Sequence, residues 1–166
     1  MESIEIKQEI EKAIDKAEYS YDYCKAADSI IKDLGDEYWA KEVYNKAIDK
    51  AEDTHDYSHI AESIIENLGG KDWGKELYSK GLDKAETVNH YRNIAGSIIK
   101  NLGDKDWGKE LYSKGLDKAE TSNDYALVGA DIIYLLKDKQ WGKKIYLKAL
   151  DQAENAKDYR NIAADV

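Results

Sequence analysis

Residues 88–121 read VNHYRNIAGSIIKNLGDKDWGKELYSKGLDKAET, and this stretch decides the fold. In its first part the apolar side chains recur every three or four residues: Tyr91, Ile94, Ala95, Ile98, Ile99 and Leu102. That spacing forms a single apolar stripe along a helix. In the second part of the stretch the apolar positions cover about half of a helical wheel: Trp107, Leu111, Tyr112, Gly115, Leu116 and Ala119. A half-apolar helix has to contact more than one neighbour, so the stretch predicts a helix pair within a layered stack.

The same pattern recurs with a period of 34 residues. The tryptophans mark it: Trp39, Trp73, Trp107 and Trp141. So does a column of tyrosines: Tyr23, Tyr57, Tyr91, Tyr125 and Tyr159. A fixed period of about 20–50 residues is typical of stacked-repeat architectures. We therefore expect an all-α solenoid in one continuous array, with a capping half-unit, four repeats and a truncated fifth first helix: 1–19, 20–53, 54–87, 88–121, 122–155 and 156–166. The second and third repeats share the run GKELYSKGLDKAET, which indicates recent duplication or consensus design.

Composition excludes several other classes of protein. The 166 residues include no proline, which favours helices over the many turns of a sheet protein. No apolar stretch is long enough for a membrane span, and the polar start MESIEIKQEIEK is unlike a secretory signal, so we expect a cytoplasmic protein. The single cysteine, Cys24, excludes an internal disulfide framework and a zinc site built from several cysteines.

Residues that cap helices stand where each helix should begin or end. Glycines follow three of the first helices, where a left-handed C-cap is expected: Gly35, Gly69 and Gly103. In the fourth repeat Lys137 takes this place. Aspartates precede three of the second helices as N-caps: Asp36, Asp104 and Asp138. N-caps also open the next first helices: Asp53, Thr87, Thr121 and Asn155. Caps therefore define the hinges between units, and the Lys137 turn should be either more costly than its glycine counterparts or differently shaped.

The two ends of the array should differ. In the half-unit, Glu5 and Glu9 replace the tryptophan and leucine of the repeats, so that this helix should present a solvated outer face. The fifth first helix stops at Val166, so part of the apolar face of the last repeat should be poorly covered.

The period, the helix pair and several columns resemble the tetratricopeptide repeat over nearly the whole chain. The family's first-helix motif is similar to Tyr91, Ile94, Ala95 and Ile98. The second-helix motif is matched more loosely, because tryptophan replaces its small first residue and its terminal proline is absent. The resemblance implies a right-handed superhelix whose first helices line a groove that binds a peptide or protein.

The resemblance also implies which residues line that groove. They are Tyr21, Cys24, Asp28 and Lys32, then His55, Ser58, Glu62 and Glu66, then Asn89, Arg92 and Lys100, then Asn123, Ala126, Ala130 and Tyr134. Members that bind a chaperone's terminal carboxylate use a basic clamp at these places. Cys24 and Ser58 stand where basic residues would be needed, so we expect this clamp to be absent.

Catalytic and metal chemistry is weakly indicated. His55 and His59 lie four residues apart, with Glu62 a further turn along, which could form a zinc site but has no third strong ligand. Cys24 has no evident activating base, and no glycine-rich phosphate loop is present. Most aromatic residues fall in three repeating columns, of the Tyr23, Trp39 and Tyr44 types, which predicts core positions. We therefore expect no enzyme, no cofactor and no bound metal.

The net charge of −9 is concentrated in the first half of the chain, and the second half is nearly neutral. That distribution favours basic partners at the N-terminal half and disfavours nucleic acid. Two hypotheses follow. The first is a non-enzymatic scaffold that binds a peptide or protein on its first helices. The second is a structural or consensus-designed array without a specific ligand, associating end to end. An RNA-binding array of the pentatricopeptide type and a metal protein using His55, His59 and Glu62 remain weaker alternatives.

Overall fold

A computed structural model describes residues 2–164, except for the side chains of Glu2, Ala156, Asn161, Ala163 and Ala164. Within these residues every regular element is helical and there is no strand. The helices are α1 (Glu2–Asp15), α2 (Ser20–Ser29), η1 (Ile30–Leu34), α3 (Glu37–Asp49), α4 (Thr54–Leu68), α5 (Lys71–Leu82), α6 (Val88–Leu102), α7 (Lys105–Leu116), α8 (Ser122–Asp131), η2 (Ile132–Leu136), α9 (Lys139–Asp151) and α10 (Ala156–Ala164). The elements η1 and η2 are π-helical turns that continue α2 and α8. No helix of the described part of the chain has the length and apolar character needed to cross a bilayer.

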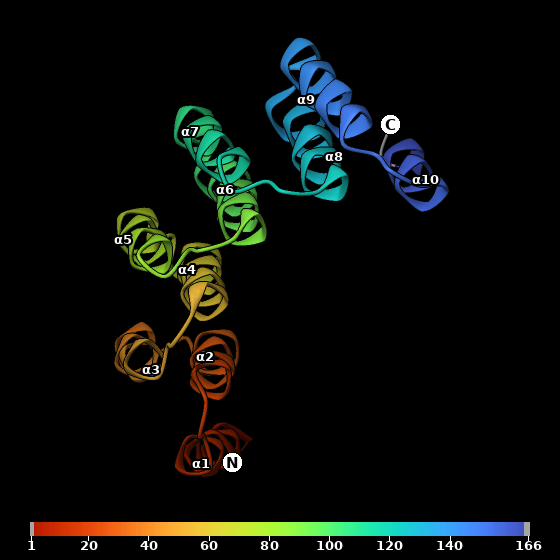
Figure 1. The fold of residues 1–166 in the computed structure, drawn as a ribbon. Coiled ribbons are helices and arrows are strands. Elements are labelled where there is room, and N and C mark those ends of the chain that lie inside the picture. The colour runs from red at the N-terminus through yellow and green to blue at the C-terminus, as the bar shows by residue number, and fades with distance from the viewer. Residues whose placement is uncertain (1, 165–166) are drawn as a thin grey trace. The chain divides into compact units, whose positions relative to one another are not determined.

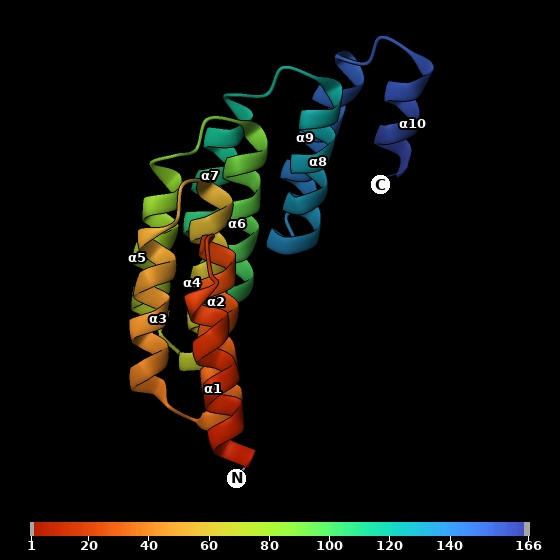
Figure 2. The same ribbon diagram turned by 90° about the horizontal axis from the view of Figure 1, so that it is seen from below.

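The chain forms two compact units, Met1–Lys84 and Ala85–Val166. In the first unit, α2 packs mainly on α3 and α4 mainly on α5, with α1 against α2 (Figure 1). In the second, α6 packs on α7 and α8 on α9, and α10 contacts both α8 and α9. Figure 2 shows the helices of each unit lying side by side. We call α2 with η1, α4, α6, and α8 with η2 the first helices, and α3, α5, α7 and α9 the second helices.

The predicted N-caps are confirmed. Carboxylates of Asp36, Asp104 and Asp138 accept the backbone N–H of the tryptophan three residues later, at 2.9–3.0 Å. Side chains also cap α4, α6, α8 and α10: Asp53, Thr87, Thr121 and Asn155. Gly70, which the sequence pattern did not place, is the N-cap of α5 and provides no side-chain acceptor. The hinges that precede α3, α4, α6, α7, α8, α9 and α10 are thus held by hydrogen bonds between the capping side chain and the next helix.

The left-handed C-caps are also confirmed. Gly35, Gly69 and Gly103 have φ of +65°, +63° and +73°. Lys137 adopts φ +62° at the same position of the fourth repeat, and no other described non-glycine residue has positive φ. A side chain in this conformation has its Cβ close to the following carbonyl oxygen. The turn therefore has the shape of its counterparts and carries a backbone strain that they avoid.

Lys137→Gly should raise the free energy of unfolding by about 0.5–1 kcal/mol, because relief of strain exceeds the extra chain entropy of glycine. Urea denaturation followed by circular dichroism would measure the change. The reverse substitution, Gly103→Lys, is the matched control and should be destabilising, since no atom crowds a Cβ at that position and only the backbone resists it. Equal stability of Lys137→Gly and the parent chain would contradict this explanation.

A second capping contact recurs at the third position of the first helices. The carboxylate there accepts the backbone N–H of the residue four positions earlier, at 2.9–3.2 Å: Asp22, Asp56, Asp124 and Asp158. In α6 the position holds His90, whose Nδ1 accepts the N–H of Glu86 at 3.1 Å. The imidazole thus provides the hydrogen bond without the negative charge that favours a helix N-terminus.

His90→Asp should therefore stabilise the second unit by about 0.5–1 kcal/mol, through a stronger acceptor and a favourable interaction with the helix dipole. Thermal denaturation at neutral pH provides the measurement. Asp124→His, the reciprocal change in α8, should lower the melting temperature. If His90→Asp were less stable than the parent, the assignment of this position as a charged cap would be wrong.

The core of each unit is built from the apolar stripes predicted by the sequence. Buried residues include Ile30, Ile60, Ile64 and Leu77 in the first unit and Ile94, Ile98, Leu111 and Ile132 in the second. Gly115 lets α6 and α7 approach closely, since a Cβ there would lie 3.2 Å from the Cβ of Tyr91. The prediction for the aromatic columns was only partly right. The Tyr44-type column is buried (Tyr44, Tyr78, Tyr112 and Tyr146), whereas the tryptophans are half-buried and Tyr159 is 51% exposed.

The two terminal helices, α1 and α10, differ in how they cover the ends of the chain's helix pairs. Glu5 and Glu9 are exposed on α1, while Ile10 is buried against the first unit. At the other end Ile162 of α10 joins a core cluster with Ala126, Tyr146 and Ala149, so the last repeat is better covered than predicted. Leu147 and Leu150 of α9 nevertheless remain exposed. Val166 lies outside the described residues.

Candidate binding face of the first helices

The residues predicted to line a groove come from the first helices of both units. In the first unit, α2 and α4 lie next to each other, with the second helices α3 and α5 on their other side (Figure 1). Tyr21 on α2 is 51% exposed and His55 on α4 is also exposed, while Ser58 and Glu62 are half-buried. His55, Ser58 and Glu62 recur at three- and four-residue spacing and share a face of α4. Tyr21 lies beside this face through its contact with His59.

An aromatic cluster connects α2 and α4 on this face. The ring of Tyr21 lies 5.0 Å from that of His59, and the His59 ring lies 6.5 Å from that of His55. The Nζ of Lys25 sits 5.4 Å from the centre of the Tyr21 ring. His59 Nδ1 is buried and has no hydrogen-bond partner. The cluster provides an amphipathic surface with rigid rings, which is the kind of surface enriched at protein-binding sites.

A hydrogen-bonded network lies behind the aromatic cluster. The hydroxyl of Tyr44 donates to Asp28 at 2.5 Å, and the Asn67 amide donates to the same carboxylate at 3.0 Å. Ser63 also donates to Asp28, at 3.4 Å. Burial raises the pKa of the Tyr44 hydroxyl, and its hydrogen bond to Asp28 raises it further. The network joins α2, α3 and α4 and fixes the two first helices that carry the cluster.

Cys24 and Ala126 are corrections to the predicted groove. Both have 0% exposure and belong to the core. They sit on the edge of the apolar stripe, and the neighbouring first helix covers that edge. A single helical wheel cannot show such coverage, because it depends on how close the next helix lies.

Cys24 should consequently be unreactive in the folded protein. Burial raises the pKa of its thiol to about 12, and at pH 8 this lowers the thiolate fraction by about a thousandfold relative to a free cysteine. Labelling with Ellman's reagent should proceed only as fast as the first unit opens, and at full speed in denaturant. Rapid labelling of the native chain would contradict the burial.

In the second unit the structure gives Arg92 a structural partner. Its Nε lies 2.7 Å from the carboxylate of Asp131, and the two side chains are 25% and 21% exposed. The contact joins α6 to α8. Arg92 is therefore engaged in an ion pair within the unit, and Asp131 is a residue that the sequence prediction missed.

The other predicted residues of the second unit are more accessible. Asn89, Lys100 and Asn123 are exposed. Tyr134 on η2 is 71% exposed, and the Nζ of Lys137 lies 4.7 Å from the centre of its ring. None of these four contacts another in the interactions described for this unit. They comprise three exposed polar side chains and one prominent aromatic ring, and no ring–ring contact of Tyr134 is found among the residues that the structure describes.

Tyr112 is the counterpart of Tyr44 in the second unit, and it has no polar partners like those of Tyr44. The hydroxyl of Tyr112 is buried without a hydrogen bond. Burial raises its pKa, as it does for Tyr44. Asp28 and Asn67, which bind Tyr44, correspond at a spacing of 68 residues to Gly96 and Leu135. A Cβ on Gly96 would lie 3.9 Å from the Tyr112 oxygen, so Gly96 stands beside this hydroxyl and offers it no side-chain acceptor.

Two polar contacts between neighbouring first helices share one sequence offset. Asn67 follows Asp28 by 39 residues, and Asp131 follows Arg92 by 39 residues. The offset is one period plus a little more than one helical turn. Pairing polar residues at this offset in the sequence locates both contacts, whereas the 34-residue columns locate neither.

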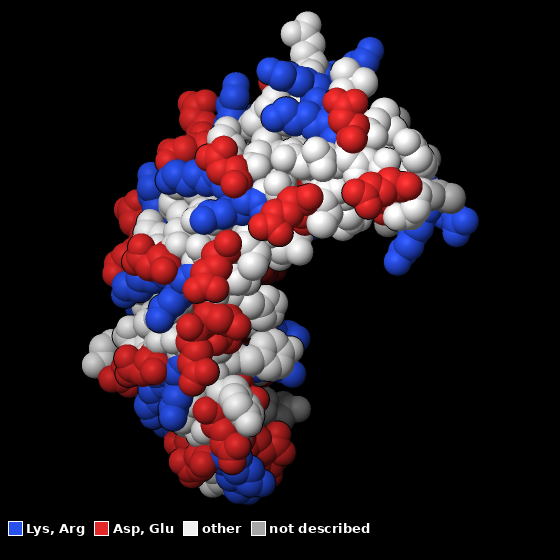
Figure 3. Space-filling view, in the orientation of Figure 1, with Lys and Arg blue, Asp and Glu red and all other residues white. Residues whose placement is uncertain are grey.

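The histidine pair does not form a metal centre with a third ligand. Among the residues that the structure describes, no group of three or more His, Cys, Asp or Glu side chains is arranged to hold a metal ion. Charged groups are mixed over the face that Figure 3 shows, where Asp and Glu lie interspersed with Lys and Arg in both units. That visible face presents no continuous basic track of the kind that phosphate backbones require.

Comparison with protein-family models, with curated proteins and with solved structures finds no match to this chain.

Proposed function

We propose that the chain is a right-handed solenoid of four tetratricopeptide-like repeats that binds a peptide or protein segment on its first helices, without catalysis. The architecture is supported by helix pairs that recur with the 34-residue period and end in equivalent caps. The binding function is supported above all by the Tyr21–His59–His55 cluster, which joins two first helices at the surface. Tyrosine and histidine rings lose little conformational entropy on binding and contact both apolar and polar groups.

A peptide library selected against the intact chain tests this proposal. Peptides that bind should lose about tenfold or more of their affinity for Tyr21→Ala, as expected for an aromatic anchor. Tyr38→Ala is the matched control, because Tyr38 is a 75% exposed tyrosine on the second helix α3. Selected peptides that bind Tyr21→Ala as well as the parent chain, or a selection that yields none, would contradict the proposal. Arg92→Glu would be a poor probe, because it places two carboxylates together at Asp131.

The second candidate function is a structural array that associates with copies of itself. It is favoured by the exposure of large apolar side chains near the C-terminal end: Leu147, Leu150 and Tyr159. Light scattering over a wide concentration range tests it. A mass that grows with concentration and becomes constant in Leu147→Lys/Leu150→Lys would support self-association, and a constant monomeric mass of the parent chain would exclude it.

A further inference from the structure

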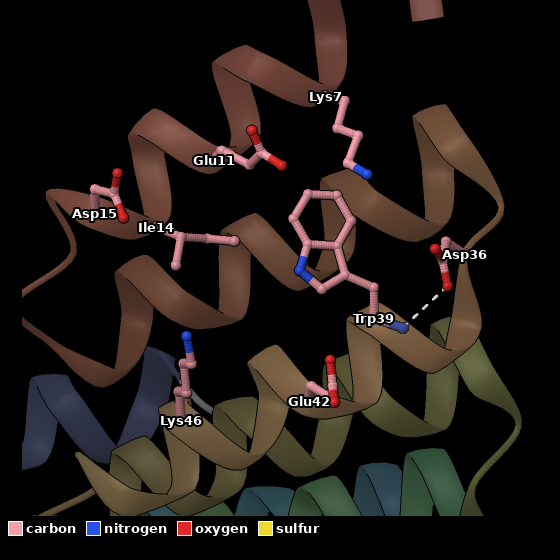
Figure 4. Close-up of a pocket in the computed structure, with 8 residues that line it drawn as sticks. All are labelled: Lys7, Glu11, Ile14, Asp15, Asp36, Trp39, Glu42 and Lys46. Atoms are coloured by element: carbon pink, nitrogen blue, oxygen red, sulfur yellow. Dashed lines mark hydrogen bonds between the residues drawn. The ribbon is translucent and has the colours of Figure 1, made fainter. Parts of the chain in front are cut away.

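A pocket between α1 and α3 has the ring of Trp39 at its centre and four carboxylates around it, with Lys7 and Lys46 also among its lining residues. Its volume is about 280 Å³, which suits one side chain better than a cofactor. Figure 4 shows the indole of Trp39 projecting from α3 toward α1, with Glu11 on the α1 side of the ring and Glu42 on the α3 side. Asp15 and Asp36 add two further acidic groups at the rim. This pocket lies outside the first-helix face described above.

The ring of Trp39 already attracts a cation. The Nζ of Lys7 lies 5.6 Å from the centre of the indole, within the range of a cation–π interaction. Lys7 is exposed, and neither it nor the two glutamates take part in an ion pair found among the described residues. A mobile ammonium on a long stem is easily displaced by a better-matched cation.

The second unit has the same cation–π contact without the carboxylates. There the Nζ of Lys109 lies 5.5 Å from the centre of the Trp141 ring. Three periods after Glu11 and Glu42 stand Ser113 and Lys144. Glu11 has no acidic counterpart in the later repeats, whereas the counterparts of Glu42 in the second and third repeats, Glu76 and Glu110, form ion pairs with Lys80 and Lys114. The combination of Glu11 with a Glu42 that forms no such pair among the described residues therefore distinguishes the pocket at Trp39.

We propose that the pocket between α1 and α3 binds an arginine side chain of a partner protein, with the guanidinium stacked on Trp39 in place of Lys7 and hydrogen-bonded to Glu11 and Glu42. A guanidinium is planar, weakly hydrated and suited both to stacking on indole and to forked contacts with carboxylates. The acidic first half of the chain attracts such a partner over longer distances. The proposal is independent of whether the first-helix face binds a peptide.

Fluorine NMR of the full chain labelled with 5-fluorotryptophan tests the proposal. Each of the four tryptophan signals is assigned by a single Trp→Phe substitution, and N-acetyl-arginine methylamide is the probe. The Trp39 signal should shift with millimolar affinity, and the Trp141 signal should not move. The neutral analogue N-acetyl-citrulline methylamide should leave all signals unchanged.

Substitutions around Trp39 and Trp141 provide further tests in the same fluorine NMR experiment. Lys7→Ala should tighten binding of the probe about two- to fivefold by removing the competing cation. Glu11→Ser/Glu42→Lys, which installs the residues of the second unit, should abolish the Trp39 shift while circular dichroism shows an unchanged fold. Lys109→Ala should not create binding at Trp141. A Trp39 signal that stays fixed in Lys7→Ala, or that moves in parallel with Trp141, would overturn the proposal.

Discussion

Phenylalanine in place of Tyr44 should lower the free energy of unfolding of the first unit by about 1–3 kcal/mol. The Tyr44 hydroxyl donates the shortest of the hydrogen bonds to Asp28, and its removal leaves a half-buried carboxylate with weaker partners. Asp28 keeps its contacts with Asn67 and Ser63, so the expected loss is that of one hydrogen bond to a charged group, which is larger than that of a hydrogen bond between neutral groups. Urea denaturation and native-state amide exchange in α2 and α3 would measure the loss.

Tyr112→Phe is the matched control in the second unit. The hydroxyl of Tyr112 is buried without a partner, so its removal should be neutral or stabilising by about 1 kcal/mol. The same substitution at two equivalent positions is thus expected to destabilise the first unit and not the second. Equal losses at both positions would show that packing of the ring edge, rather than the Asp28 network, decides the effect.

The second large effect concerns the ion pair between α6 and α8. Asp131→Ser should destabilise the second unit by about 1–3 kcal/mol, because the guanidinium of Arg92 is then partly buried without its carboxylate. The cost stays below that of a fully buried pair, because water still reaches a quarter of the Arg92 side chain. Urea denaturation of the single variants and the double variant provides the measurement.

The double variant is designed from the residues at the equivalent positions of the first unit. Cys24 and Ser63 stand at the same 39-residue offset as Arg92 and Asp131. Arg92→Cys/Asp131→Ser therefore installs a neutral pair that the fold already accommodates, and it should recover most of the loss of either single variant. If the double variant lost as much unfolding free energy as the two single variants together, the two side chains would not interact and the two units would not be equivalent at this position.

Much of the fold could be predicted from the sequence, because helix ends and apolar stripes are local. The period located the helix pairs, and Gly103, Asp104 and Thr121 cap helices where their residue types predicted. Lys137 shows the limit of such reasoning. The sequence predicts a turn at Lys137 that is costly or differently shaped. In the structure the backbone of Lys137 keeps the left-handed conformation of the glycine turns and is strained.

The candidate site was harder to predict, because it depends on distances between helices. Cys24 and Arg92 occupy the same repeat column, yet one is core and the other forms an ion pair. The difference arises from the neighbouring first helix, which presents Ser63 to one and Asp131 to the other. The sequence pattern makes His59 a candidate for a metal site only, whereas its contact with Tyr21 follows from the packing of α4 on α2.

The central claim is that the first helices form the binding face. The most direct measurement is a ¹⁵N NMR titration of the full chain with a peptide selected from the library. The account predicts chemical-shift changes concentrated on α2 and α4, strongest around Tyr21, His55 and His59, with the exposed positions of α3 and α5 unchanged. Changes confined to the second helices, with Tyr21 and His59 unaffected by saturating peptide, would contradict it.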